Sequence, residues 1–259
     1  MTTPTSSDAP PPRLSALAFH GPLSEERAAR IVARLAAVEP ASVLDVGCGW
    51  GELLLRVLAA APGAEGVGVD LDAEDLERGR RLARERGLAA RVRYVEESAR
   101  GTGRGPADVV LCNGAGQALA EPGRPERYLP ELFAALRSLV NPGGRVLLGE
   151  GFYRRPPTGA ELSRMWPGAT AEEHPSLGVL VDAAVAAGFR PLWTETASDS
   201  EWEEFESGYR AAREEWLAAH PGHALAPEVA RAVDTQRSAW LHGYREVLGI
   251  AYLTLVPVV

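Results

Sequence analysis

The sequence predicts an α/β fold, a Rossmann-like and mostly parallel seven-stranded sheet with helices on both faces. Short apolar runs alternate with amphipathic segments as far as residue 196, and a glycine-rich turn, GCGWG, follows the first of these runs. A long helical segment then precedes a final apolar run, which we expect to form an antiparallel last strand. Alternating strands and helices favour parallel pairing, because a parallel crossover needs a connection of about a dozen residues or more.

The hydrophobic pattern places each element. A first helix is expected over 24–38, where Ser24 precedes Glu25 and Glu26 and apolar residues recur at helical spacing. Strands are expected over 41–46, 66–69, 92–95, 107–111, 144–149, 189–196 and 250–258. Further helices are expected over 52–61, 73–87, 130–139 and 176–187.

Residues 199–249 read as two helices joined around Pro221-Gly222 and inserted before the last strand. Such an insertion could cover the ligand-binding edge of the sheet as a helical cap. We therefore expect one domain over 13–259, with a disordered tail over 1–12 that is rich in Thr, Ser and Pro.

Composition excludes several classes of function. The formal net charge of −8 and the scattered arginines argue against nucleic acid or a membrane surface as a partner. The two cysteines are far apart, and His174, His220, His223 and His242 form no metal-binding set, so we expect no metal and place these histidines at the surface. A cytoplasmic monomer or homodimer is the resulting expectation.

The turn Gly47-Cys48-Gly49-Trp50-Gly51 carries the functional argument. In an open α/β sheet the ligand binds beyond the carboxyl ends of the strands, and alternate glycines let a ligand approach the main chain closely. Cys48 itself is expected to be a small packing residue, because nothing nearby in the sequence would activate its thiol.

Three acidic residues indicate the kind of ligand. Asp45 ends the first strand, where a carboxylate can face a cation, and Asp70 ends the second strand, where an acid can accept ribose hydroxyls. Glu52 stands where a dinucleotide fingerprint has its third glycine and would repel a pyrophosphate. Asp72 is the better candidate for the next helix cap, which leaves Asp70 for the ligand. These features fit a cationic nucleoside without phosphate.

The segments VLDVGCGWGELLL and GVGVDLD resemble the glycine loop and ribose acid of the class I S-adenosylmethionine-dependent methyltransferases. The similarity continues through ADVVLCNGAG and LVNPGGRVLLGEGFYRRPP, and it extends to the N-terminal HGPLSEE and the Trp-rich C-terminal helices. The resemblance implies S-adenosylmethionine as cofactor and a small-molecule methyl acceptor. The cofactor-binding residues it implies are Asp45, Gly47, Cys48, Gly49, Gly51, Asp70, Leu71, Glu97, Ser98, Ala99, Asn113 and Gly114.

One position departs from the family pattern. After the third strand the family usually has an acidic residue followed by Ala, which contacts the adenine amino group. Here Ser98 takes that place, with Glu97 beside it. A hydroxyl would accept a weaker hydrogen bond than a carboxylate.

Methyl transfer from a sulfonium to an O, N or S atom is an in-line displacement, so the protein mainly positions the reactants and excludes water. His20 and Glu150 are the candidate general bases for an acceptor that must lose a proton. Gln117, Tyr153, Arg154 and Tyr209 are the candidate substrate-binding residues.

Two other functions are compatible with parts of the sequence. A nicotinamide-dependent oxidoreductase can use a similar sheet, but the spacing of the glycines and Glu52 disfavour it. A non-catalytic module that binds S-adenosylmethionine stays open, since no indispensable catalytic residue can be identified in this fold from the sequence.

Overall fold

The computed structural model describes residues 9–11, 14, 16–122 and 124–258, so the tail predicted over 1–12 falls mainly outside the described residues. The chain groups into two compact units. The sheet unit comprises Leu23–Arg154, Glu172–Ala197 and Gly249–Val259. The helical unit comprises Arg155–Ala171, Ser198–Leu248 and the described part of the first 22 residues. The prediction of one domain over 13–259 stays a prediction.

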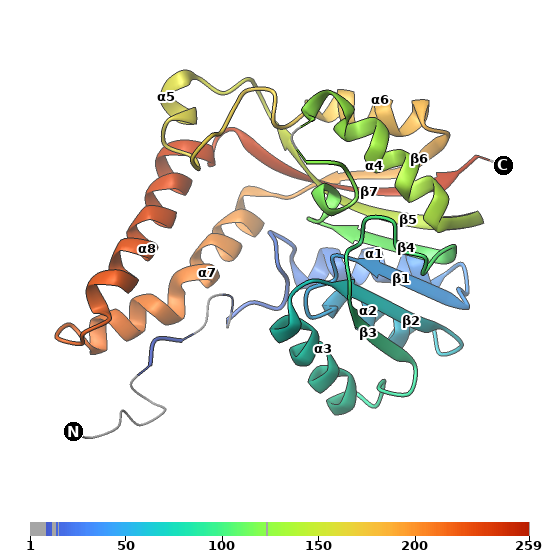
Figure 1. Ribbon diagram of the computed structural model, residues 1–259, viewed down its shortest axis with the longest axis horizontal. Coiled ribbons are helices and arrows are strands. Elements are labelled where there is room, and N and C mark those ends of the chain that lie inside the picture. Colours follow the sequence, from blue (N-terminus) through green and yellow to red (C-terminus); the bar gives the residue numbers. More distant parts are fainter. Residues whose placement is uncertain (1–8, 12–13, 15, 123, 259) are drawn as a thin grey trace. The chain divides into compact units, whose positions relative to one another are not determined.

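The sheet has seven strands in the order β3-β2-β1-β4-β5-β7-β6 (Figure 1). Its strands are β1 (Ser42–Val46), β2 (Glu65–Asp70), β3 (Val92–Glu96), β4 (Ala107–Asn113), β5 (Val140–Tyr153), β6 (Phe189–Thr196) and β7 (Leu248–Pro257). The pairs among the first five strands are parallel, and β6 pairs antiparallel with β7. The strand order reverses direction between β1 and β4, which creates the topological switch point where such sheets bind ligands. The predicted fold class is confirmed.

The helices of the sheet unit are α1 (Glu25–Ala36), α2 (Glu52–Ala60), α3 (Ala73–Glu85), α4 (Pro125–Leu139) and α6 (Leu177–Ala186). Ser24 caps α1 by accepting the Arg27 N–H, and Asp72 caps α3 by accepting the Glu74 and Asp75 N–H groups. Both caps satisfy amide groups that have no partner inside the helix.

The predicted start of the fourth helix at residue 130 is wrong. Helix α4 begins at Pro125, and Pro130 lies inside it. A proline is favourable at the first helical position because its missing N–H costs nothing there. Pro125 occupies that position, and the chain tolerates the second proline one turn later.

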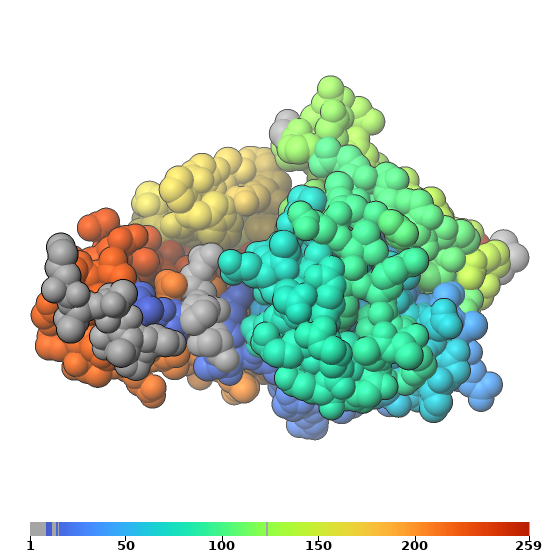
Figure 2. All heavy atoms as spheres, turned by 60° about the horizontal axis from the view of Figure 1, so that its bottom comes forward, coloured from blue at the N-terminus to red at the C-terminus, as the bar shows by residue number. Residues whose placement is uncertain are grey.

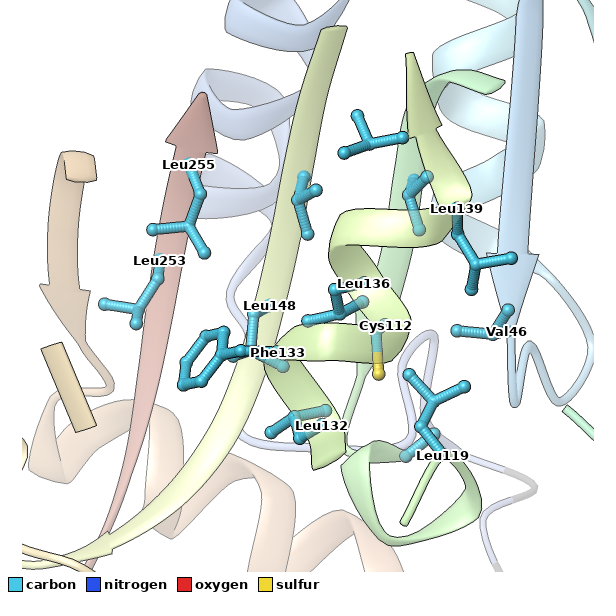
Figure 3. Packing of buried hydrophobic residues seen from close by; sticks show 14 of the residues in the cluster. Val46, Cys112, Leu119, Leu132, Phe133, Leu136, Leu139, Leu148, Leu253 and Leu255 are labelled. Carbon is cyan, nitrogen blue, oxygen red and sulfur yellow. The ribbon is translucent and has the colours of Figure 1, made fainter. Parts of the chain in front are cut away.

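The main core lies between the sheet and helices α4 and α6. Leu132, Phe133, Leu136 and Leu139 of α4 pack on residues from β1, β4, β5 and β7 (Figure 3). Strand residues in this cluster are spaced two apart, as Leu44 and Val46 are in β1 and Val110 and Cys112 are in β4, because successive side chains point to opposite faces. Asp45 therefore points away from this core, while Val46 points into it.

The predicted turn Asn141-Pro142-Gly143 lies within β5 rather than before it. Val140 pairs with Ala107, the next pair joins Arg145 to Val109, and residues 141–144 stand opposite Asp108. The Asp108 carboxylate accepts the Asn141 side-chain amide at 2.8 Å and the Ala41 N–H at 2.9 Å. These bonds fix the irregular segment at the amino ends of the strands, away from the ligand edge.

The helical unit contains α5 (Gly159–Leu162), α7 (Asp199–Ala219), α8 (Ala226–Ala239) and a π-helical turn, Trp240–Tyr244. Helices α7 and α8 confirm the prediction of two helices within residues 199–249. Glu206 is buried, and its carboxylate accepts the Tyr244 hydroxyl at 2.6 Å.

In the part of the chain that the structure describes, no helix has the length and hydrophobicity that crossing a bilayer requires.

Replacing Asp72 with Ala should destabilise the sheet unit. The variant leaves the first amide groups of α3 without their acceptor, so the free energy of unfolding should fall by about 1 kcal/mol. Chemical denaturation of the purified variant measures the effect. Asp72→Asn is the matched control, because asparagine caps helices as well as aspartate does, and a loss of equal size in both variants would contradict the capping role.

Candidate active site

The carboxyl ends of four neighbouring strands bring the predicted site residues into one row. Val46 pairs with Val69, so Gly47 and Asp70 follow side by side, and Asn113 pairs with Gly149 on β5. The row crosses the switch point between β1 and β4. The structure thus places the predicted glycine turn, ribose acid and post-β4 residues at one edge.

The glycine turn has a backbone that only glycine adopts easily. Gly47, Gly49 and Gly51 have φ values of 65°, 53° and 69°. At Gly47 a side chain would also overlap the Cβ of Ala115, and at Gly51 a Cβ would lie 2.5 Å from the Tyr94 hydroxyl. The turn is held because the N–H groups of Gly47 and Cys48 both donate to the Val69 carbonyl, at 2.9 and 3.0 Å. Conformation and packing therefore both require glycine here.

Asp45 lies two residues before Gly47 and is only 4% exposed. Among the described residues no donor hydrogen-bonds to its carboxyl group. Burial raises the pKa of Asp45 well above its usual range, and the negative charge of Asp70 adds to the increase. Burial disfavours the ionised form of a carboxyl group that has no partner, and a nearby cation would favour that form.

Asp70 connects β2 to the glycine turn. Its Oδ2 accepts the Gly49 N–H at 2.7 Å, and its Oδ1 accepts the Asp72 N–H at 3.0 Å. Each carboxylate oxygen can accept more than one hydrogen bond, so capacity for a ligand remains. Leu71, the next residue, is 70% exposed, which is unusual for a large apolar side chain beside a candidate site.

The segment after β3 has its polar groups already engaged. The Glu97 carboxylate accepts Arg104 at 2.7 Å and the Thr102 hydroxyl at 2.8 Å. The bond from Arg104 lowers the pKa of Glu97 to about 2. Ser98 is exposed, and its hydroxyl oxygen accepts the Arg100 N–H at 3.2 Å, while Ala99 is buried. Figure 2 shows α3 and this neighbouring segment, in teal to green, at the surface of the sheet unit.

Asn113 and Gly114 end β4 beside the glycine turn. A Cβ at Gly149 would overlap the Asn113 side-chain oxygen, so that side chain lies across β5. Gly114 is exposed and has a φ of 72°. Gln117 is also exposed, and its side-chain amide donates to the Gly114 carbonyl at 3.4 Å.

Glu150 is buried beyond the last β4–β5 pair. It is 7% exposed, and its Oε2 accepts the Tyr128 hydroxyl at 2.8 Å. Burial raises the pKa of Glu150 to about 7, against the opposing effect of the bonds from Tyr128 and the Gly151 N–H. A carboxyl group with this pKa can exchange a proton near neutral pH.

His174 is a residue that the sequence misplaced at the surface. It is half-buried, and a Cβ at Gly151 would lie 2.8 Å from its ring. Its ring meets the buried Tyr153 ring edge-on, with centroids 5.1 Å apart, and burial lowers its pKa. Arg154, the residue after Tyr153, is exposed. The sequence signal for this packing is Gly151, two residues before Tyr153. It does not show that the His174 ring is the one that packs on Gly151.

Two predicted site residues, His20 and Tyr209, belong to the helical unit. His20 is exposed, and the Tyr209 ring packs on Phe205 with centroids 6.2 Å apart. Their roles at the site stay predictions.

Glu52 does not present the uncompensated negative charge that the prediction of pyrophosphate repulsion requires. It is buried at the start of α2, where its carboxylate accepts Arg56 at 2.7 Å and Arg86 at 2.8 Å. Two guanidinium groups offset its charge, so the expected repulsion of a pyrophosphate is weakened. The spacing of the glycines still disfavours a dinucleotide, as does an Asp45 carboxyl group that has no hydrogen-bond partner among the described residues.

The sheet order, the glycine turn and the strand-end acids are those of a Rossmann-like fold with a candidate ligand site at its switch point. A family model described as a methyltransferase domain matches residues 44–146, the part that contains the glycine turn and the segments after β2, β3 and β4. A solved S-adenosylmethionine-dependent methyltransferase from Thiobacillus denitrificans, in complex with S-adenosyl-L-homocysteine, is 27% identical, with a TM-score of 0.79 over 94% of this chain and 95% of that chain.

Two further proteins match along nearly the whole length. A structure of a methyltransferase from Geobacter sulfurreducens has a TM-score of 0.79 at 24% identity, over 96% of this chain and 99% of that chain, and supports the fold. The uncharacterized protein YjhP of Escherichia coli is 26% identical over 244 residues, 92% of this chain and 93% of that protein. The chain is thus similar to a methyltransferase domain over residues 44–146, and to an S-adenosylmethionine-dependent methyltransferase along most of its length.

Replacing Glu150 with Gln should remove one component of the pH dependence of stability. The pKa of Glu150 is about 7 in the folded protein against an ordinary value of 4.5. Its contribution to stability is therefore complete below the ordinary value and is lost as the pH rises through the folded value. The measured quantity is the difference in unfolding free energy, wild type minus Glu150→Gln. This difference should fall by up to about 3 kcal/mol between about pH 4 and about pH 8. Urea denaturation across this range measures it, and a constant difference would refute the raised pKa.

Proposed function

We propose that the chain binds S-adenosylmethionine along the carboxyl ends of β2, β1 and β4 and transfers its methyl group to a small molecule. The observation that carries the proposal is the Asp45 carboxyl, which is buried beside the glycine turn with no hydrogen-bond partner among the described residues. The α-ammonium group of the cofactor supplies the missing cation. A nicotinamide dinucleotide has no such group and brings a pyrophosphate instead.

The other parts of the cofactor have candidate residues along the same row. The Asp70 carboxylate would accept the ribose hydroxyls while it holds the glycine turn through the Gly49 N–H. Leu71 would cover one face of the adenine ring, which explains an apolar side chain exposed at this edge. Residues 97–99 would flank the adenine, with Ser98 as the acceptor for its amino group. Asn113 and Gly114 would contact the methionine part.

When bound, S-adenosylmethionine supplies an electrophilic methyl group on a sulfonium. The residues of the site hold the reactants in line and exclude water, so the carbon–sulfur bond breaks as the new bond to the acceptor forms. An acceptor that loses a proton needs a base, for which His20 and Glu150 are the candidates. Gln117, Tyr153, Arg154 and Tyr209 are proposed to contact the acceptor.

A small-molecule acceptor agrees with the charge of the protein. The formal net charge of −8 gives no general attraction for nucleic acid or for anionic lipid. We propose a cytoplasmic enzyme that works as a monomer or a homodimer.

Isothermal titration calorimetry with S-adenosylmethionine, S-adenosylhomocysteine and NADH tests the cofactor assignment before any acceptor is known. We expect saturable binding of the first two, with dissociation constants in the micromolar range, and no binding of NADH. Formation of S-adenosylhomocysteine that depends on an added acceptor would then distinguish the enzyme from a non-catalytic module. Binding of NADH alone would overturn the proposal.

Replacing Asp70 with Ala, or Gly49 with Val, should weaken S-adenosylhomocysteine binding about tenfold or more without unfolding the protein. The first change removes a charged acceptor for the ribose, and the second adds a side chain at a glycine with positive φ. Asp72→Asn is the control, because it alters the neighbouring acid but retains the helix cap. Wild-type affinity in both folded variants would show that the site is wrongly assigned.

A further inference from the structure

Two consecutive residues after β4 connect the glycine turn to a buried carboxyl group. Ala115 fills the space that a side chain at Gly47 would occupy. Gly116 lies against Glu150 and Tyr128, so closely that a Cβ at this position would overlap the Glu150 Oε2 and the Tyr128 hydroxyl. A displacement on one side of this pair therefore reaches the other side through a single peptide unit.

The Glu150–Tyr128 pair is firmly held. Glu150 is on β5 and Tyr128 is on α4, and the hydrogen bond between them is 2.8 Å long. The second carboxylate oxygen accepts the Gly151 N–H at 3.2 Å. Glu150 is buried, and Tyr128 packs against the main core. Close-packed groups of this kind transmit small changes in volume to their neighbours.

We propose that Glu150 and Tyr128 are positioning residues for the cofactor site. Through Gly116 and Ala115 they hold the glycine turn at Gly47 in the conformation that binds the cofactor. This inference rests on the proposed function, since it takes the glycine turn as the cofactor site.

The proposal assigns Glu150 a role different from that of a general base. The side of the carboxyl group that accepts Tyr128 is covered by Gly116, and the whole residue is 7% exposed. What the contact with Gly116 requires is the volume of the side chain and an oxygen that accepts the Tyr128 hydroxyl. Glutamine provides both, whereas alanine provides neither.

The test compares S-adenosylhomocysteine affinity in four variants by isothermal titration calorimetry at about pH 8. Glu150→Ala and Gly116→Ala should each raise the dissociation constant about tenfold, one by leaving space beneath Gly116 and the other by forcing the chain outward. Glu150→Gln should stay within about threefold of wild type, and Tyr128→Phe should fall between. Glu126→Gln, an exposed change on the same helix, is the control.

The outcomes separate this inference from the proposed function. Failure of wild type to bind S-adenosylhomocysteine would remove the proposed function and this inference with it. Binding by wild type, with Glu150→Ala and Gly116→Ala folded and equally tight, would overturn the positioning role alone. A Glu150→Gln variant as weak as Glu150→Ala would also overturn it, because charge rather than packing would then matter. If Glu150→Ala fails to fold, Gly116→Ala and Tyr128→Phe decide.

Discussion

The structure of the site depends on one constraint, a carboxyl group that is buried near the end of β1 and has no hydrogen-bond partner in the described part of the chain. Strand alternation turns Asp45 away from the α4–α6 core, and the glycine turn covers the end of the strand. Burial raises the pKa of Asp45 well above its usual range, and we propose that a cationic ligand offsets the cost of ionising this group. The affinity for an ammonium group that we propose would follow from the position of Asp45 near the end of β1.

The surrounding features keep that position fixed. The Val69 carbonyl accepts both N–H groups of Gly47 and Cys48, and Asp70 accepts the Gly49 N–H, so β2 holds the turn from one side. Ala115 packs on Gly47 from the β4 side. The acid proposed to bind ribose thus also helps to shape the turn, and the two functions are difficult to separate by mutation. The Cys48 sulfur lies against Gly68, and burial raises the pKa of the Cys48 thiol.

Periodicity and turn chemistry were sufficient to predict the sheet, the caps at Ser24 and Asp72, and the gathering of Asp45, Gly47, Asp70 and Asn113 at one edge, since these depend on local patterns and on parallel strand order. Long-range packing was not accessible. The sequence could not show that Arg86, far along the chain, pairs with Glu52, or that the His174 ring packs on Gly151. The predicted start of α4 at Pro130 is wrong because Pro125 already occupies the first position of that helix and Pro130 lies inside it.

Proton release on cofactor binding tests the central claim most directly. If Asp45 is protonated in the free protein and ionises against the ligand ammonium group, binding of S-adenosylhomocysteine at about pH 6 should release protons. Calorimetry in buffers of different ionisation enthalpy measures this release, and Asp45→Asn provides the reference. The account predicts a release by wild type that exceeds that of Asp45→Asn. Equal release by both proteins, with binding intact, would contradict it.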